Sequence, residues 1–219
     1  MMLAVALASA GCSGAKKGPS PAPEESLEVR ARRAVLQRGD LPTGWTANAA
    51  GGTDAGHGHG HGHGQAWAEF RNCVPGGQGL DAGAVQATSG VFASGGATVE
   101  STVAYVGADQ TSQFAGSVTS TSTLDCGKSA LSAEAVRRAP PGVTPRREEL
   151  VPLTVTHPAG SWAWGIRNTT TYSSGSKVVT DLMLVIKGDA LGRLVFVNDG
   201  GPFPSALEQA LIEKVAGRA

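Results

Sequence analysis

The pattern of hydrophobic and polar positions is clearest in the C-terminal third of the chain. Two apolar, β-rich runs, residues 178–187 and 191–197, are separated only by Gly188-Asp189, which predicts a hairpin-like turn. Residues 149–156 and 161–172 form two further runs with strand character upstream. This part of the chain is therefore expected to supply four strands of a sheet.

The chain closes with a helical pattern. Ser205 and Glu208 have the spacing of a capping box, in which each side chain bonds the backbone of the other residue. The helix that follows is expected to pack through its apolar positions, Leu207, Ala210, Leu211 and Val215.

The first half of the chain alternates between helical and extended patterns. The predicted helices cover 24–38, 66–73, Asp109 to Cys126 and a short piece around 131–136, and the extended segments cover 85–93 and 97–106. Strands in runs, with helices segregated around them, are typical of an α+β domain. We expect a single domain over residues 24–219, with a largely antiparallel sheet of about six strands flanked by helices.

The first fourteen residues, MMLAVALASAGCSG, have the pattern of an export signal: an uncharged apolar run, then small residues, then Cys12. The position of the cysteine resembles a bacterial lipoprotein signal, in which residues 1–11 are removed and Cys12 carries the lipid. Residues 12–23, small and rich in proline, would then be a flexible spacer on the outer side of the cell membrane. Because the run lacks Lys and Arg, ordinary secretion and an apolar N-terminus on a cytosolic protein stay open as alternatives.

Charge and motifs narrow the function. Lys and Arg number 18, as do Asp and Glu, and no basic stripe typical of a nucleic-acid binder is present. The chain has no GxSxG elbow, HExxH motif or paired-carboxylate motif, and Gly127-Lys128-Ser129 follows a segment without the glycine that a phosphate loop needs. We expect no catalysis and no nucleic-acid partner.

Two of the three cysteines are expected to pair. With Cys12 lipidated, Cys73 and Cys126 are left as an even pair in an oxidising compartment. A bridge that closes this interval would stabilise the fold by about 4 kcal/mol. The alternative is two free, buried thiols.

Four histidines, His57, His59, His61 and His63, alternate with glycine at the end of a low-complexity loop at 46–64. Neutral imidazoles suit Zn, Ni or Cu, so the run is a candidate metal site. The opposing view is a tolerated surface expansion, because ordering such flexible residues is unfavourable. No other cofactor is expected.

Trp162 and Trp164 share one face of the predicted strand at 161–172. They are candidates to line an apolar cleft, although aromatic residues at strand spacing belong more often to a core.

Three features together resemble a known family: the turn Leu41–Trp45 (LPTGW), the pair Cys73 and Cys126, and the closing stretch from Asp181 to Arg218. They are similar to actinobacterial cell-envelope lipoproteins, which resemble the extracellular sensor domains of mycobacterial membrane Ser/Thr kinases. The resemblance implies an antiparallel sheet flanked by helices, with a cleft for a ligand. This chain has one candidate disulfide where those sensors have two, and it shows no kinase pattern.

The expected function is that of a lipid-anchored, extracytoplasmic binding or sensor-like module. Its partner would be the membrane, through the lipid, and an unknown small ligand, envelope component or protein. A metal-binding envelope lipoprotein that acts through the His-Gly loop is the alternative, and an unrecognised hydrolase is the third hypothesis.

Overall fold

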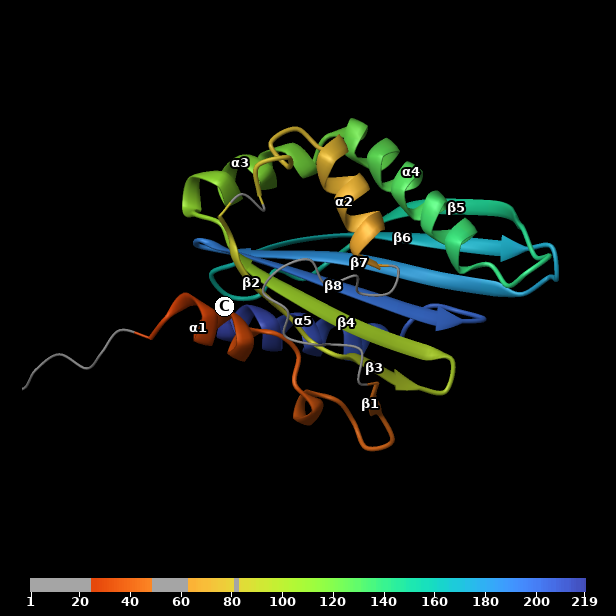
Figure 1. Cartoon of the computed structure of the whole chain (residues 1–219), viewed down its shortest axis with the longest axis horizontal. Coiled ribbons are helices and arrows are strands. Elements are labelled where there is room, and N and C mark those ends of the chain that lie inside the picture. The colour runs from red at the N-terminus through yellow and green to blue at the C-terminus, as the bar shows by residue number, and fades with distance from the viewer. Residues whose placement is uncertain (1–24, 49–62, 81–82) are drawn as a thin grey trace, which may run out of the picture.

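The computed structural model describes residues 25–48, 63–80 and 83–219. Their fold is a single α+β domain, in which α-helices pack on an open antiparallel sheet of eight strands (Figure 1), so the predicted fold class is confirmed. The strands are β1 (Thr46–Asn48), β2 (Val85–Thr88), β3 (Val91–Ser94), β4 (Ala97–Tyr105), β5 (Pro145–Leu153), β6 (Trp162–Tyr172), β7 (Lys177–Lys187) and β8 (Ala190–Asp199). The helices are α1 (Leu27–Ala34), the short 3-10 helix η1 (Arg38–Asp40), α2 (His63–Cys73), α3 (Ala108–Val118), α4 (Thr121–Arg138) and α5 (Ser205–Arg218).

The strands follow the spatial order β1-β3-β4-β8-β7-β6-β5, and β2 also pairs with β4. The predicted hairpin joins β7 to β8, with Lys187 opposite Ala190. Gly188 turns the chain there with a φ of 58°, a conformation that glycine adopts without steric cost.

Helices cover both faces of the central strands. α1 and α5 pack on one face, and α2, α3 and α4 lie on the other (Figure 1). This explains why β8 is buried without interruption from Ala190 to Val197: strands covered on both sides carry apolar residues at consecutive positions. Leu194 and Phe196 point toward α5, and Val195 and Val197 belong to the core under α2 and α4.

Two differences explain why the sheet has eight strands and not the expected six or so. The extended segment 85–93 is divided into β2 and β3 at Ser89. Its backbone N–H still donates to the Ser101 carbonyl, but its side-chain hydroxyl accepts the Ser101 N–H. Thr46–Asn48, expected in a loop, forms the edge strand β1 against β3.

The helix predicted from Asp109 to Cys126 is two helices. α3 ends at Val118 and α4 begins at Thr121, and the Thr123 hydroxyl donates to the Ser117 carbonyl at 2.9 Å across the break. Asp109 lies in the first turn of α3, and the N-cap is Gly107.

The capping box predicted at the last helix is wrong. The N-cap of α5 is Pro204, with no side-chain capping bond, and Glu208 turns into the protein. The buried stripe is accordingly shifted from the predicted one, with Ala210 exposed; it consists of Glu208, Leu211, Ile212, Val215 and Ala216. None of the described helices is long and apolar enough to cross a bilayer.

Candidate functional site

The helices α2 and α4 lie side by side above the sheet (Figure 1), and a disulfide joins them. The sulfur atoms of Cys73, the last residue of α2, and Cys126, in α4, are 1.99 Å apart. The bridge fixes the two helices to each other at one end, and the space between them and the sheet is the candidate site.

A glycine lets α4 approach the sheet closely. A Cβ atom at Gly127 would lie 2.5 Å from the Cδ1 atom of Ile166 on β6, which is too close for any side chain without a shift. Gly127-Lys128-Ser129 is therefore the interior of a helix that packs on β6, which gives this tripeptide a packing role.

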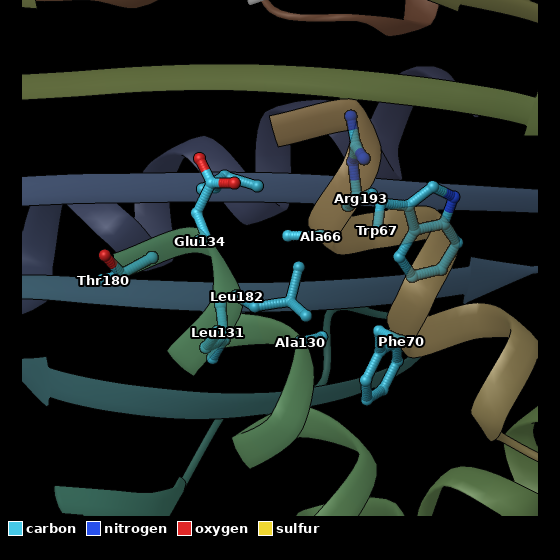
Figure 2. A pocket seen from close by; sticks show the side chains of 10 residues that line it. Ala66, Trp67, Phe70, Ala130, Leu131, Glu134, Thr180, Leu182 and Arg193 are labelled. Atoms are coloured by element: carbon cyan, nitrogen blue, oxygen red, sulfur yellow. The ribbon is translucent and has the colours of Figure 1, made fainter. Parts of the chain in front are cut away.

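A narrow slot lies between α2, α4 and the strands β7 and β8. Its interior space is about 20 Å³, room for about one or two water molecules. Figure 2 shows Trp67 and Phe70 entering from α2 on one side and Leu131 and Glu134 from α4 on the other. The lining residues are mostly apolar: Ala66, Trp67, Phe70, Ala130, Leu131, Glu134, Thr180, Leu182, Arg193 and Val195.

A wider groove is lined by positions further along β7, β8 and α4. Val178 lies two residues before Thr180 on β7, and Val197 lies two residues after Val195 on β8, so each pair shares a face. The groove has about 800 Å³ of open space. Its lining mixes apolar and charged residues: Arg138, Pro140, Tyr172, Gly175, Ser176, Lys177, Val178, Val197, Asp199 and Gly200.

Arg193 is the most unusual residue of the slot, because its side chain is only 8% exposed. Its Nη2 donates to the Thr102 hydroxyl at 2.9 Å and lies 3.5 Å from a carboxylate oxygen of Glu100. The guanidinium carbon is 5.5 Å from the centre of the Trp67 ring, and Figure 2 shows the two side chains next to each other. Nε and Nη1 are buried and have no hydrogen-bond partner among the described residues.

Burial opposes the charge of Arg193. It lowers the pKa of the guanidinium, Glu100 raises it, and the positive charge of Arg71 lowers it. A guanidinium nevertheless stays protonated in proteins. Burial also raises the pKa of the Glu100 carboxyl, against the opposing effect of Arg193. Arg193 is therefore a buried cation with one carboxylate nearby and donors to spare, an arrangement that favours an additional acceptor.

The acidic residue of the slot is already matched. Glu134 is 4% exposed, and its carboxylate accepts hydrogen bonds from Arg138 at 2.6 Å and from Arg137 at 3.1 Å. Arg137 also contacts Glu69 of α2 at 3.1 Å, which links the C-terminal end of α4 to α2. Glu134 therefore holds Arg137, and Arg137 in turn contacts α2.

Comparisons with protein-family models, curated proteins and solved structures found no match.

The two tryptophans proposed from the sequence lie beside the slot and outside its lining. Trp164 stacks on Phe70 with the ring centres 5.9 Å apart, so it supports a residue that does line the slot. Trp162 is further away and packs edge-on against His157 at 6.4 Å.

Several other predicted residues lie outside the described part of the chain. These are Cys12 and three histidines of the run, His57, His59 and His61. His63 is the first residue of α2, and only its backbone is described. Within the described residues, no three His, Cys, Asp or Glu side chains come together in a way that could hold a metal ion.

Sequence reasoning missed Arg193, although a signal was present. The stretch 190–197 (ALGRLVFV) is apolar except for this one arginine. Arginine is rarely fully buried without a partner, so a lone arginine in a strand covered on both faces marks a position with a special environment.

Proposed function

We propose that this protein is a non-catalytic binding module, anchored outside the cytoplasm by a lipid on Cys12, that holds a small ligand in the slot and the groove. The observation that carries the proposal is the buried guanidinium of Arg193, with two unused donor nitrogens, in an aromatic and apolar slot. Apolar walls with a few convergent polar groups are typical of ligand sites.

The chemistry of the slot supports binding without catalysis. Its ionisable residues are Glu134 and Arg193. Glu134 is engaged by two arginines, and a guanidinium does not give up its proton at neutral pH. General acid–base catalysis needs a group that can exchange a proton with the substrate, and neither side chain offers one.

The N-terminal pattern supports the proposed location. An apolar run, small residues and Cys12 are followed by a proline-rich spacer before the folded domain begins near α1. Such a spacer would leave the site free to face solvent above the membrane.

A filled-site variant tests ligand binding. Thr180 lines the slot, and Val178, two residues away on the same face of β7, lines the groove, so Thr180→Phe would place a ring between the two. The control is Thr169→Phe, at a half-buried threonine of β6. Thr169 shares a face of the strand with Arg167, and this face is turned away from the slot. The neutral fluorescent probe N-phenyl-1-naphthylamine should bind saturably to the unmodified protein and to Thr169→Phe, and at least about tenfold more weakly to Thr180→Phe. Absence of saturable binding, or equal binding by both variants, would overturn the proposal.

A further inference from the structure

We propose that the ligand of this site is a carboxylate amphiphile, whose acidic head meets Arg193 in the slot while its linear apolar body lies along the groove. The idea rests on the proposed function and narrows it to one class of ligand.

The head group follows from the hydrogen-bonding capacity of Arg193. A guanidinium has five N–H donors and no acceptor, so only an acceptor can satisfy Nε and Nη1. Bonds from a guanidinium to an anionic oxygen are roughly twice as strong as bonds between neutral groups. In a buried site, an anionic oxygen is therefore the acceptor that gains most from this residue.

The charge around Arg193 leaves room for an anion. Glu100 is the carboxylate nearest to it, and their closest contact, 3.5 Å, is longer than an ordinary charge-assisted hydrogen bond. Glu134, the other carboxylate of the slot, is bound by Arg137 and Arg138. A ligand carboxylate would add a close partner to Arg193 without meeting an unpaired acid.

The size of the slot sets the size of the head. The interior of the slot, about 20 Å³, is on the scale of one or two water molecules, so a compact head such as a carboxylate fits it better than a bulky one. The rest of the ligand must therefore lie outside the slot, in the adjoining groove of about 800 Å³.

The direction of the body follows from the strands. Arg193, Val195 and Val197 lie at alternate positions of β8, and Leu182, Thr180 and Val178 follow the same course on β7. Four residues of strand separate Arg193 from Val197, a length of about 13 Å. A linear chain that starts at Arg193 would thus run over Val195 and Val197 into the groove that Arg138 and Lys177 help to line.

Two probes that differ only in the head group test the assignment. Dodecanoate and methyl dodecanoate, both below their micelle-forming concentrations, are used to displace N-phenyl-1-naphthylamine from the full-length protein. We expect dodecanoate to displace the probe at least about tenfold more tightly than the ester. In Arg193→Met this preference should disappear, and in Arg193→Lys, which keeps the charge, it should be partly retained.

The outcomes separate this inference from the proposed function. If both probes displace the dye equally from the unmodified protein, the carboxylate assignment is overturned while ligand binding stands. If the dye does not bind at all, the proposed function itself fails. Far-UV circular dichroism and thermal unfolding of both arginine variants check folding. If Arg193→Met does not fold, Arg193→Lys decides. A folded Arg193→Lys that has lost the preference for dodecanoate over the ester overturns the role of the charge, and one that retains it supports that role.

Discussion

Glu208 and Asp181 occupy one buried site between α5 and β7, although both are carboxylic acids. Their residues are 5% and 1% exposed. Arg167 lies opposite Asp181 on β6 and donates to both of its carboxylate oxygens, at 2.6 and 2.7 Å, while its Nη2 is 3.8 Å from Glu208. One guanidinium thus serves two carboxyl groups. Burial, the hydrogen bond with Asp181 and the charge of Asp181 raise the pKa of Glu208 to about 9, with Arg167 opposing, so Glu208 is protonated at neutral pH.

Protonated Glu208 stabilises the fold at low pH, and this stabilisation is lost as the pH rises. The ordinary pKa of a glutamate is 4.5, so between 4.5 and about 9 the folded protein holds one more proton than the unfolded chain. This stabilisation is complete below the unfolded pKa and is lost as the pH rises through the folded pKa. We expect urea unfolding between about pH 5 and about pH 8 to show a free energy of unfolding that falls by up to about 1.4 kcal/mol per pH unit from this group.

Glu208→Gln should flatten this dependence and leave the protein more stable than the unmodified form at about pH 8, because the amide keeps a hydrogen-bond donor toward Asp181 and carries no charge. A residual slope is expected from Glu100, whose pKa burial also raises. Glu213→Gln, at an exposed position of α5, is the matched control and should retain the full slope. Identical slopes in the two variants would contradict the assignment of the proton to Glu208.

The strands of the C-terminal third could be predicted to within a few residues because their apolar runs are long and interrupted only by turn residues. The segment 161–172 became Trp162–Tyr172, and the hairpin at Gly188-Asp189 formed as expected. The capping box at Ser205 failed for a non-local reason. Its spacing was right, but Glu208 is buried beside Asp181 and Arg167, away from the N-terminal end of its own helix.

The candidate site could be predicted only in part. Asp181 and Arg193 are visible in the sequence as lone charges within apolar strands. What surrounds them is set by strand register and helix packing: Arg193 meets Thr102 because β4 pairs with β8, and it meets Trp67 because α2 crosses the same strand. Such contacts join residues far apart in the chain, and no local pattern encodes them.

The stability of the fold should depend on the absence of a side chain at Gly127, where α4 packs on β6. Gly127→Ala gains up to about 1 kcal/mol of helix propensity but forces the new methyl group against Ile166, which is fully buried; overpacking of this kind costs about 1–3 kcal/mol. We expect a net loss in the free energy of unfolding by urea. Gly116→Ala in α3, where a Cβ would meet nothing within 4 Å, is the control and should be stabilising. Ile166→Val removes the clashing Cδ1, so in that background Gly127→Ala should lose most of its penalty. A penalty that persists there would contradict the steric explanation.

The bridge between α2 and α4 should contribute strongly to stability. Its two cysteines are separated by 53 positions, and for a loop of that length the chain-entropy argument gives about 4 kcal/mol. Cys73→Ala/Cys126→Ala should therefore unfold at a markedly lower urea concentration. Reductant should lower the midpoint of the unmodified protein toward that of the double variant and leave the double variant unchanged. Equal midpoints for the oxidised protein and the double variant would show that the bridge adds no stability. Since Phe70 and Trp67 stand on the helix that the bridge holds, the double variant should also bind N-phenyl-1-naphthylamine more weakly.

Cys12 should decide where the protein resides. If residues 1–11 are a lipoprotein signal, the mature chain begins with an acylated cysteine, and two or more acyl chains give stable membrane attachment. Cys12→Ser should then abolish incorporation of labelled palmitate and move the protein from the sedimented membrane fraction to the soluble fraction. Cys73→Ala/Cys126→Ala serves as the control, because it removes thiols without touching the signal and should stay with the membranes. The intact mass of the membrane-extracted protein should lack residues 1–11 and include the lipid. A Cys12→Ser protein that sediments as completely as the unmodified protein would contradict the anchor.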